Sequence, residues 1–249
     1  MSTLRQWLRQ TVPLSIRQSW AHARRRLQDI KNGIDLKNQR ASDLSGYQMQ
    51  VELTQPIMPS ALFENKLSNL RHSAHLLNLC QIQPQQIWSF WHTIGSPTEN
   101  NGFVVGRNLV NGELTRQVGG GLCQSSSLIY HLALLAGMTI LERHPHSIDI
   151  YEEEQRFTPL GADATVVWGF KDLRLINPHP FDVIFECFVH EHLITARVYA
   201  AHQLPQLHVQ FVRQSLSDTQ ARVTTMVNQV KHTETIYEQK QGIVLKPQV

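Results

Sequence analysis

The chain has 249 residues, of which 41% are hydrophobic and 17% charged, with three cysteines and a formal net charge of +3. This length and composition exclude a disordered chain and a disulfide-stapled miniprotein. The cysteines are odd in number and unrelated in spacing, so we expect neither a closed disulfide framework nor a CxxC metal site. No apolar run approaches the roughly 18 to 20 residues that cross a bilayer, and Arg5 and Arg9 interrupt the N-terminus. We therefore expect no transmembrane segment, no signal peptide and a cytoplasmic location.

Residues 1–40 form a basic arm, with nine Arg or Lys against two Asp, a net charge of +7 that leaves −4 for the rest of the chain. Apolar residues recur there at helical spacing: Ile16, Trp20, Ala23, Leu27, Ile30 and Ile34. Three interpretations compete: a helix packed on the body with its arginines in solvent, a helix on an inner membrane surface, and a nucleic-acid contact. No aromatic interleaving accompanies the arginines, so no nucleic acid is expected.

The next segments predict a strand from Tyr47 to Leu53, a helix from about Ser60 to Leu79 and a strand from Ile87 to Ile94. Residues 95–121 contain loops with one or two short strands. Cys80 follows the predicted helix, and we interpret it as a small buried hydrophobe.

The segment GGGLCQSSSLIYHLALLAG, residues 119–137, predicts a glycine-rich turn followed by an apolar helix. Ser125, Ser126 and Ser127 offer N-capping hydroxyls, and Gly137 is placed to end the helix. Cys123 is therefore expected at the helix N-terminus.

Further strands are predicted around His146–Ile150, Asp163–Trp168, Leu173–Ile176, Val183–Val189 and Leu193–Tyr199. Cys187 lies within one of them and is interpreted as core. From about residue 203, four strand-like pieces alternate with polar turns: LHVQFVRQ, RVTTMVNQV, TIYEQ and GIVLKPQ. We divide the chain into a basic helical arm (1–45), a main domain (46–202) and a β-rich C-terminal extension (203–249).

A helix N-terminus favours a thiolate, so Cys123 has the environment of a nucleophile. Backbone N–H groups of the turn at Gly119, Gly120 and Gly121, helped by the Gln124 side chain, could bind an oxyanion. His146 is the preferred base, with His144 as the substitute, and Asp163 is the orienting carboxylate. A Cys at a helix start, followed by a His and an Asp on neighbouring strands, is the arrangement of papain-like and transglutaminase-like enzymes. We expect an α/β or α+β fold with such a helix-plus-antiparallel-sheet core.

The alternatives stay open at this point. Cys123 is also small enough to be a purely structural residue of a glycine-rich turn. Arg143 and Asp163 could form a structural ion pair, and Glu142 and Arg143 are structural or substrate-positioning rather than catalytic. A metal site of Cys123, His144 and His146 lacks an obvious second ligand pair, so we expect no metal and no cofactor.

The chain resembles the VanW family, which is named for a protein of vancomycin B-type resistance clusters. Six segments carry the resemblance, which covers roughly residues 60–200 in order: ENKLSNL, SFWHTIGSP, GGGLCQSSSLIY, ERHPHSIDIY, PLGADATV and DLRLIN.

The resemblance implies a cysteine-dependent, L,D-transpeptidase-like activity on peptidoglycan or its precursors, with a link to glycopeptide resistance. It places the nucleophile on Cys123 and the base on His144 or His146. The expected function is a Cys-His-Asp acyl transferase or hydrolase. The competing hypothesis is a non-catalytic protein that binds a peptide or glycopeptide in the same glycine-rich cleft.

Overall fold

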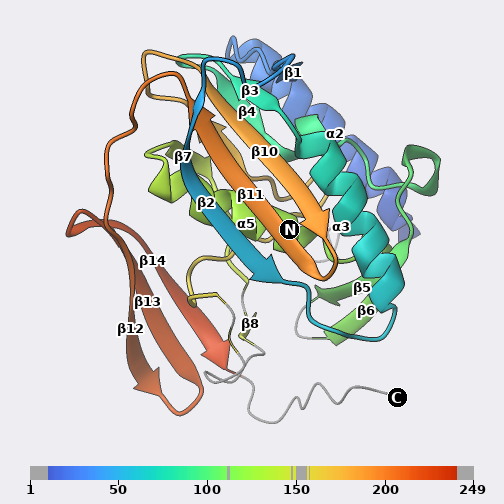
Figure 1. Ribbon diagram of the computed structural model, residues 1–249. Coiled ribbons are helices and arrows are strands. Elements are labelled where there is room, and N and C mark those ends of the chain that lie inside the picture. Colours follow the sequence, from blue (N-terminus) through green and yellow to red (C-terminus); the bar gives the residue numbers. More distant parts are fainter. Residues whose placement is uncertain (1–10, 111–112, 147, 150–155, 157, 240–249) are drawn as a thin grey trace.

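Figure 1 shows the computed structural model, which describes residues 11–110, 113–146, 148–149, 156 and 158–239. The helices are α2 (Leu14–Lys31), α3 (Phe63–Leu77), α4 (Phe90–Ile94), the 3-10 turn η1 (Glu99–Asn101) and α5 (Leu122–Leu135). The strands are β1 (Gln39–Arg40), β2 (Gln48–Pro56), β3 (Cys80–Ile82), β4 (Ile87–Ser89), β5 (Val105–Val110), β6 (Glu113–Val118), β7 (Thr139–Glu142), β8 (Ile148–Asp149), β9 (Arg174–Ile176), β10 (Val183–His190), β11 (Leu193–Ala200), β12 (Val209–Ser217), β13 (Gln220–Val227) and β14 (Val230–Gln239).

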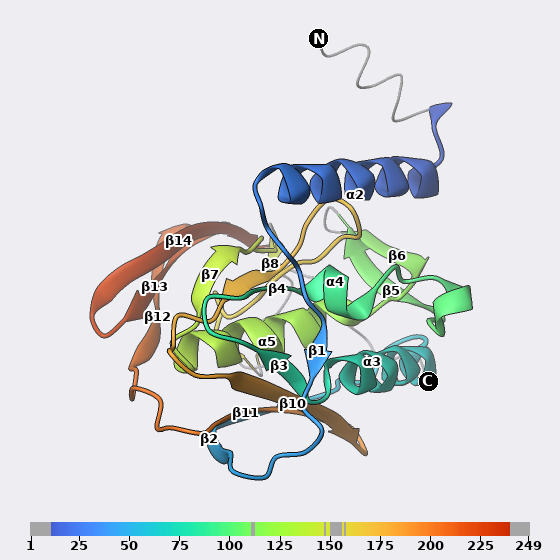
Figure 2. The ribbon, with the colours of Figure 1, turned by 90° about the horizontal axis from the view of Figure 1, so that it is seen from above.

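The core is organised around an antiparallel sheet with the strand order β1-β3-β10-β11-β2. Helix α3 packs against β10, and α5 packs against β2 and β11. Figure 2 shows the layers from above: this sheet, then α3 and α5, then the short sheet β4-β9-β7, and α2 outermost. A second sheet, β12-β13-β14-β8, stands beside the core. The expected mixed α/β class with antiparallel sheets is confirmed.

Apolar periodicity explains the two central helices. In α3, the buried positions Leu67, Leu70, Ala74 and Leu77 follow helical spacing, so one face covers the sheet. Helix α5 is buried on more than one side because it lies between two sheets. The predicted helices at residues 60–79 and after Gly121 are confirmed with these narrower bounds.

One predicted strand is shorter than expected, and another is wrong. The strand expected at Ile87–Ile94 ends at Ser89, whose hydroxyl accepts the His92 N–H and thereby caps α4. Asp163–Trp168 forms no strand. Its backbone instead bonds to side chains of α5 and to the carbonyl of His144, which receives the Thr165 N–H at 2.6 Å. This irregular segment therefore depends on α5 for its position.

The strands predicted after residue 172 are confirmed, except for the last piece. Strands β9, β10 and β11 match the predicted segments, and the pieces up to TIYEQ form the hairpins of β12, β13 and β14. The last piece, GIVLKPQ, lies outside the described residues. Cys80 and Cys187 are buried as expected, and the indole N–H of Trp88 donates to the Cys80 sulfur at 3.2 Å.

The basic arm forms the expected helix α2, but with the opposite face toward the body. Of the three interpretations left open for the arm, the one that packs the helix on the body would bury the apolar stripe and leave the arginines in solvent. In the structure, Ile16, Trp20, Leu27 and Ile30 are exposed, whereas Asp29 is buried. The charged face of α2 packs on the body because the body presents residues of opposite charge and an aromatic ring to it.

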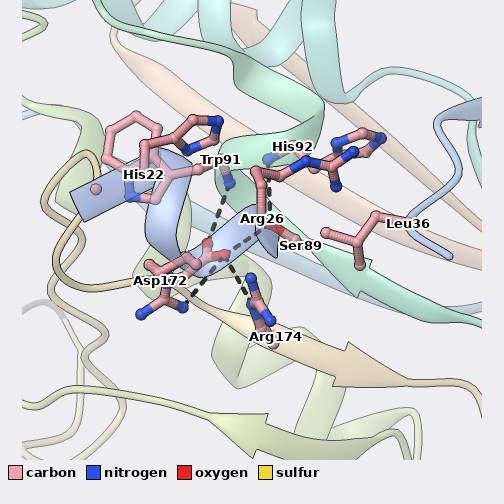
Figure 3. Close-up of a pocket in the computed structure, with 10 residues that line it drawn as sticks. His22, Arg26, Leu36, Ser89, Trp91, His92, Asp172 and Arg174 are labelled. Atoms are coloured by element: carbon pink, nitrogen blue, oxygen red, sulfur yellow. Dashed lines mark hydrogen bonds and ion pairs between the residues drawn. The ribbon is translucent and has the colours of Figure 1, made fainter. Parts of the chain in front are cut away.

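Those partners are ion pairs and a ring stack. Asp29 accepts two hydrogen bonds from Arg174, at 2.7 and 2.9 Å, and Arg25 pairs with Glu142. The His22 ring stacks on Trp168 with centroids 4.1 Å apart. A small pocket remains at this seam, and Figure 3 shows Asp172 among the residues that line it. The Asp172 carboxylate accepts hydrogen bonds from the Ser89 hydroxyl at 2.6 Å and from Arg174 at 3.1 Å.

Candidate active site

Cys123 is the second residue of α5, after Leu122, and the N-cap Gly121 lies in the left-handed region at φ +101°. The residue as a whole is partly exposed, and its thiol donates to the carbonyl oxygen of Val166 at 3.9 Å. The first N–H groups of a helix have no acceptor within the helix, and the helix dipole places positive potential there. Cys123 therefore lies at the helix N-terminus, where the sequence predicted it.

His146 is the histidine that reaches Cys123. Asp163 Oδ2 bonds to the His146 ring at Nδ1 (2.8 Å) and also accepts the backbone N–H of the same residue (2.6 Å). The ring is thereby fixed in orientation, and Nε2 is the nitrogen left for the Cys123 side chain, with which His146 interacts. The three residues thus lie in the order thiol, imidazole, carboxylate.

The electrostatics of this arrangement favour an ion pair. Burial raises the pKa of Cys123, but the hydrogen bond and positive charge of His146 outweigh it, and the pKa ends below the ordinary cysteine value. Burial lowers the pKa of His146, yet its bonds to Asp163 and Cys123 raise it to about 10. Burial opposes ionisation of Asp163 as well, but His146 and Arg143 hold the pKa of this carboxyl far below its usual range. These shifts favour the pair of thiolate and imidazolium over the pair of neutral groups.

Arg143 holds the carboxylate from the other side. Its guanidinium donates to Asp163 Oδ1 at 2.8 Å, to the backbone carbonyls of Gly161 and Asp163, and to the hydroxyl of Thr235. The side chain is almost fully buried and also lies over the Tyr130 ring, 5.0 Å from its centroid. This geometry makes Arg143 a residue that positions Asp163.

His144 has a different partner. Its Nε2 lies 2.9 Å from Glu142 Oε1, and Glu142 in turn pairs with Arg25 of α2. Of the two histidines left open by the sequence, the structure thus brings His146 to Cys123 and directs His144 toward the α2 seam.

Gln124 and Gly120, which were expected to face the substrate, instead contact other parts of the chain. The Gln124 amide donates to the Pro56 carbonyl at 2.9 Å, so the side-chain donor expected at an oxyanion is engaged with the end of β2. Gly120 packs on the backbone of β5: a Cβ atom there would lie 2.2 Å from the carbonyl carbon of Gly106. Because Gly120 has no side chain, the backbone of β5 lies directly against it, where a substrate backbone was expected. Asn69 holds this contact by donating to the Gly120 carbonyl at 2.9 Å. In the first turn of α5, the Gln124 N–H donates to the Gly121 carbonyl at 2.9 Å and the Leu122 N–H to the Gly119 carbonyl at 3.5 Å, so the candidate oxyanion donor is the Cys123 N–H.

The expected capping role of the serines is wrong, because Gly121 is the N-cap and all three serines lie inside α5. Ser125 bonds to Ser73 across to α3 at 2.7 Å. Ser126 donates to the Ala164 carbonyl at 2.6 Å, and Ser127 accepts the Ala164 N–H at 2.9 Å. Ser126 and Ser127 thus hold the segment that carries Asp163 against the helix that carries Cys123. Their spacing of three and four residues from Cys123 indicates a shared helix face and could have suggested this role.

The sequence reasoning also missed Tyr237 on β14. Its hydroxyl donates to Asp163 Oδ1 at 2.5 Å, and the Arg143 guanidinium donates to the same hydroxyl at 2.9 Å. Burial and the nearby Asp163 raise the pKa of Tyr237, so the hydroxyl keeps its proton and remains a donor. Nothing in the local sequence links this tyrosine to a residue in the middle of the chain.

The family model described as VanW like protein matches residues 65–199, which is more than half of the chain. The chain belongs to the VanW family. The expected membership is thereby confirmed, and the matched range contains Cys123, His146 and Asp163. The boundaries expected at residues 45 and 202 stay predictions.

Two relatives of the VanW domain are similar over part of their length. The chain is 31% identical over 160 residues to the vancomycin B-type resistance protein VanW of Enterococcus faecalis, a match that covers 61% of this chain and 58% of that protein. It is 33% identical over 116 residues to the uncharacterized protein YoaR of Bacillus subtilis, covering 47% and 37%. The chain thus spans little more than half of one relative and about a third of the other. No solved structure matches it significantly.

Two further properties concern the described residues only. No helix among them has the length and hydropathy of a membrane-crossing segment. Within the same part of the chain, no three side chains of His, Cys, Asp or Glu gather as the ligands of a metal ion would.

Proposed function

We propose that this VanW-family protein is a cysteine-dependent acyl transferase or hydrolase, in which Cys123 is the nucleophile, His146 the acid and base, and Asp163 the orienting carboxylate. The observation that carries the proposal is the His146 ring fixed by Asp163 at 2.8 Å and facing the thiol at the start of α5. A Cys at a helix N-terminus, packed on an antiparallel sheet and followed in the chain by its His and Asp, supports a papain- or transglutaminase-like core.

The reaction divides into two steps. The Cys123 thiolate attacks the acyl carbonyl carbon, and the Cys123 N–H, together with the dipole of α5, stabilises the oxyanion that forms. The tetrahedral intermediate collapses as the imidazolium of His146 gives its proton to the leaving amine. The thioester that remains is attacked by a second amine or by water, which His146 deprotonates, and the thiolate leaves. The second nucleophile decides between acyl transfer and hydrolysis.

We assign the substrate to the class of peptidoglycan stem peptides or their precursors. Two considerations support this class: the relative named as a vancomycin B-type resistance protein, and the L,D-transpeptidase-like activity that the family resemblance implies. A link to glycopeptide resistance is part of the same proposal.

The direct test is the intact mass of the protein after incubation with peptidoglycan stem peptides. The expected result is an acyl adduct that maps to Cys123 and is absent in Cys123→Ala. The two histidines provide a matched pair: His146→Gln should lower the rate of adduct formation by about 100-fold or more, whereas His144→Gln should leave it nearly unchanged. Equal loss in both variants, or an adduct that survives Cys123→Ala, would contradict the assignment.

The same measurement separates the enzyme from a peptide-binding protein. A binding protein would hold the stem peptide reversibly, without an adduct and without dependence on His146. The glycine-rich segment supports that alternative less well, because the space beside Gly120 is filled by Gly106, and the Lys66 side chain lies against Gly121.

A further inference from the structure

Helix α2 meets the body through its charged face and leaves its apolar face uncovered. Trp20 is 81% exposed, Ile30 67%, Leu27 60% and Ile16 52%. Successive steps of four, seven and three residues place these side chains within one stripe of the helix. In Figure 2, α2 lies at the edge of the molecule, and the labelled elements of the body all lie on one side of it.

Exposed cations lie on the same outer face. Arg24 is four residues after Trp20, and Lys31 is four residues after Leu27, so each cation lies beside an apolar side chain. The one acidic residue of α2 is Asp29, which is buried and paired with Arg174. The outer face therefore combines an aromatic and aliphatic stripe with positive charge and carries no acidic side chain.

We propose that this outer face of α2, defined by Ile16, Trp20, Arg24, Leu27, Ile30 and Lys31, docks the protein on a membrane surface that contains anionic lipid. A helix with an apolar stripe flanked by Lys or Arg lies in the plane of the interface, its apolar side chains entering the boundary between headgroups and acyl chains. The cations then meet lipid phosphates, which matches their sign.

The charge pattern decides against a second copy of the chain as the occupant. Two α2 helices packed through this face would bring Arg24 and Lys31 close to their own counterparts with no carboxylate between them, which is unfavourable. An anionic lipid surface removes this repulsion and also accommodates Trp20, whose indole suits the interfacial region.

The inner contacts of α2 make it a firm attachment for the whole body. The two bonds between Asp29 and Arg174, the Arg25–Glu142 pair and the His22–Trp168 stack together fix the helix on the core. Docking by the outer face would leave all of these inner contacts in place. The proposal is independent of the chemistry assigned to Cys123, and either can fail without the other.

The test is flotation of the full chain with vesicles of phosphatidylcholine alone or with about one third phosphatidylglycerol. We expect binding to the anionic vesicles that weakens with salt. Trp20→Gln with Leu27→Gln should weaken binding at least tenfold, and Arg24→Gln with Lys31→Gln about 25-fold, at about fivefold for each charge. The matched control is Val230→Gln, which removes an apolar side chain that is 69% exposed on β14 and should change nothing.

Three outcomes would overturn the proposal: equal binding to both kinds of vesicle, no effect of the α2 variants, or no binding at low salt. The variants change exposed side chains, so their thermal midpoints should equal that of the parent chain, which excludes misfolding as a cause. Sedimentation without lipid tests the other occupant, because a dimer that Trp20→Gln dissociates would assign this face to a second copy.

Discussion

At the scale of single residues, the three cysteines show how position controls a thiol. Burial raises the pKa of Cys80 to about 11 and that of Cys187 to about 12. Cys123 is subject to burial as well, but His146 outweighs it. Two thiols are therefore buried parts of the core whose pKa is raised, and the pKa of the third is lowered.

This contrast predicts the pH dependence of alkylation. In the parent chain, iodoacetamide should modify Cys123 with a midpoint below the ordinary cysteine value, while Cys80 and Cys187 stay unmodified until the protein unfolds. In His146→Gln the midpoint should rise above that ordinary value, because burial then acts without the imidazolium. Acyl transfer in the parent chain should decline above about pH 10, where His146 loses the proton that it must donate.

Peptide mapping by mass spectrometry at each pH measures the three thiols separately. His144→Gln serves as the control and should reproduce the parent profile, since His144 bonds to Glu142. A Cys123 midpoint that is the same in His146→Gln and in the parent would show that the imidazole does not activate the thiol.

Sequence spacing predicted most residues of this candidate site, but it missed Tyr237. A cysteine at a helix start, two histidines and an aspartate could be proposed from local pattern, because each lies beside an identifiable element. The sequence favoured His146 as the base but kept His144 as the substitute, since Pro145 between them obscures which side each ring takes. Tyr237 could not be found at all, because its contact with Asp163 depends on how two distant segments pack.

At the scale of elements, the orientation of α2 is the point on which the sequence was least informative. An apolar stripe normally indicates the face that packs on the body, and one of the three interpretations of the arm placed Trp20 inward for that reason. The body instead presents Arg174, Glu142 and Trp168, which bind the charged side of the helix. Periodicity identifies a helix and its two faces, but only the partner surface decides which face is covered.

The turn before α5 gives an element-scale prediction about stability. Gly120→Ala should lower the free energy of unfolding by about 3 kcal/mol or more, because the new Cβ would meet the backbone of Gly106 and Arg107 at 2.5 Å or less. The control is Gly46→Ala, where φ is +82° but nothing lies within 4 Å; there the cost should be about 1 kcal/mol.

Urea denaturation of the two variants gives both free energies. If Gly120→Ala cost no more than Gly46→Ala, the close packing of the glycine turn on β5 would be wrong. The sequence alone could not separate these positions. Gly120 is required because there is no space for a Cβ atom, whereas Gly46 is favoured by its positive φ angle.

At the scale of the whole molecule, the C-terminal sheet belongs to the candidate site. Strand β14 supplies Tyr237 and Thr235, which bond to the Asp163–Arg143 pair. Tyr237, Ala221 and Val223 of this sheet are fully or almost fully buried. The sequence suggested a separate β-rich extension, and composition offered no reason to connect it with Asp163.

Removing this sheet should therefore damage more than the end of the chain. A chain that ends at residue 206 should be less stable by at least about 5 kcal/mol, from the lost burial of several apolar side chains. That loss corresponds to a fall of about 10–20 °C in thermal midpoint. Tyr237→Phe, which removes only a hydroxyl, should cost about 1–3 kcal/mol.

Circular dichroism on heating distinguishes the two variants. A truncated chain that melted within a few degrees of the full chain would show that the sheet is an independent appendage. Equal effects of truncation and Tyr237→Phe would mean that the hydroxyl, and not the buried area, supplies the contribution of the sheet.

The bond between Tyr237 and Asp163 also has a consequence for synthesis. A ribosome makes Cys123, His146 and Asp163 well before it makes β14, the last strand of the described chain. While residue 237 is still inside the exit tunnel, the carboxylate lacks the tyrosine donor and Arg143 lacks part of its cover. The complete hydrogen-bond network around the thiol therefore forms only after translation has passed β14.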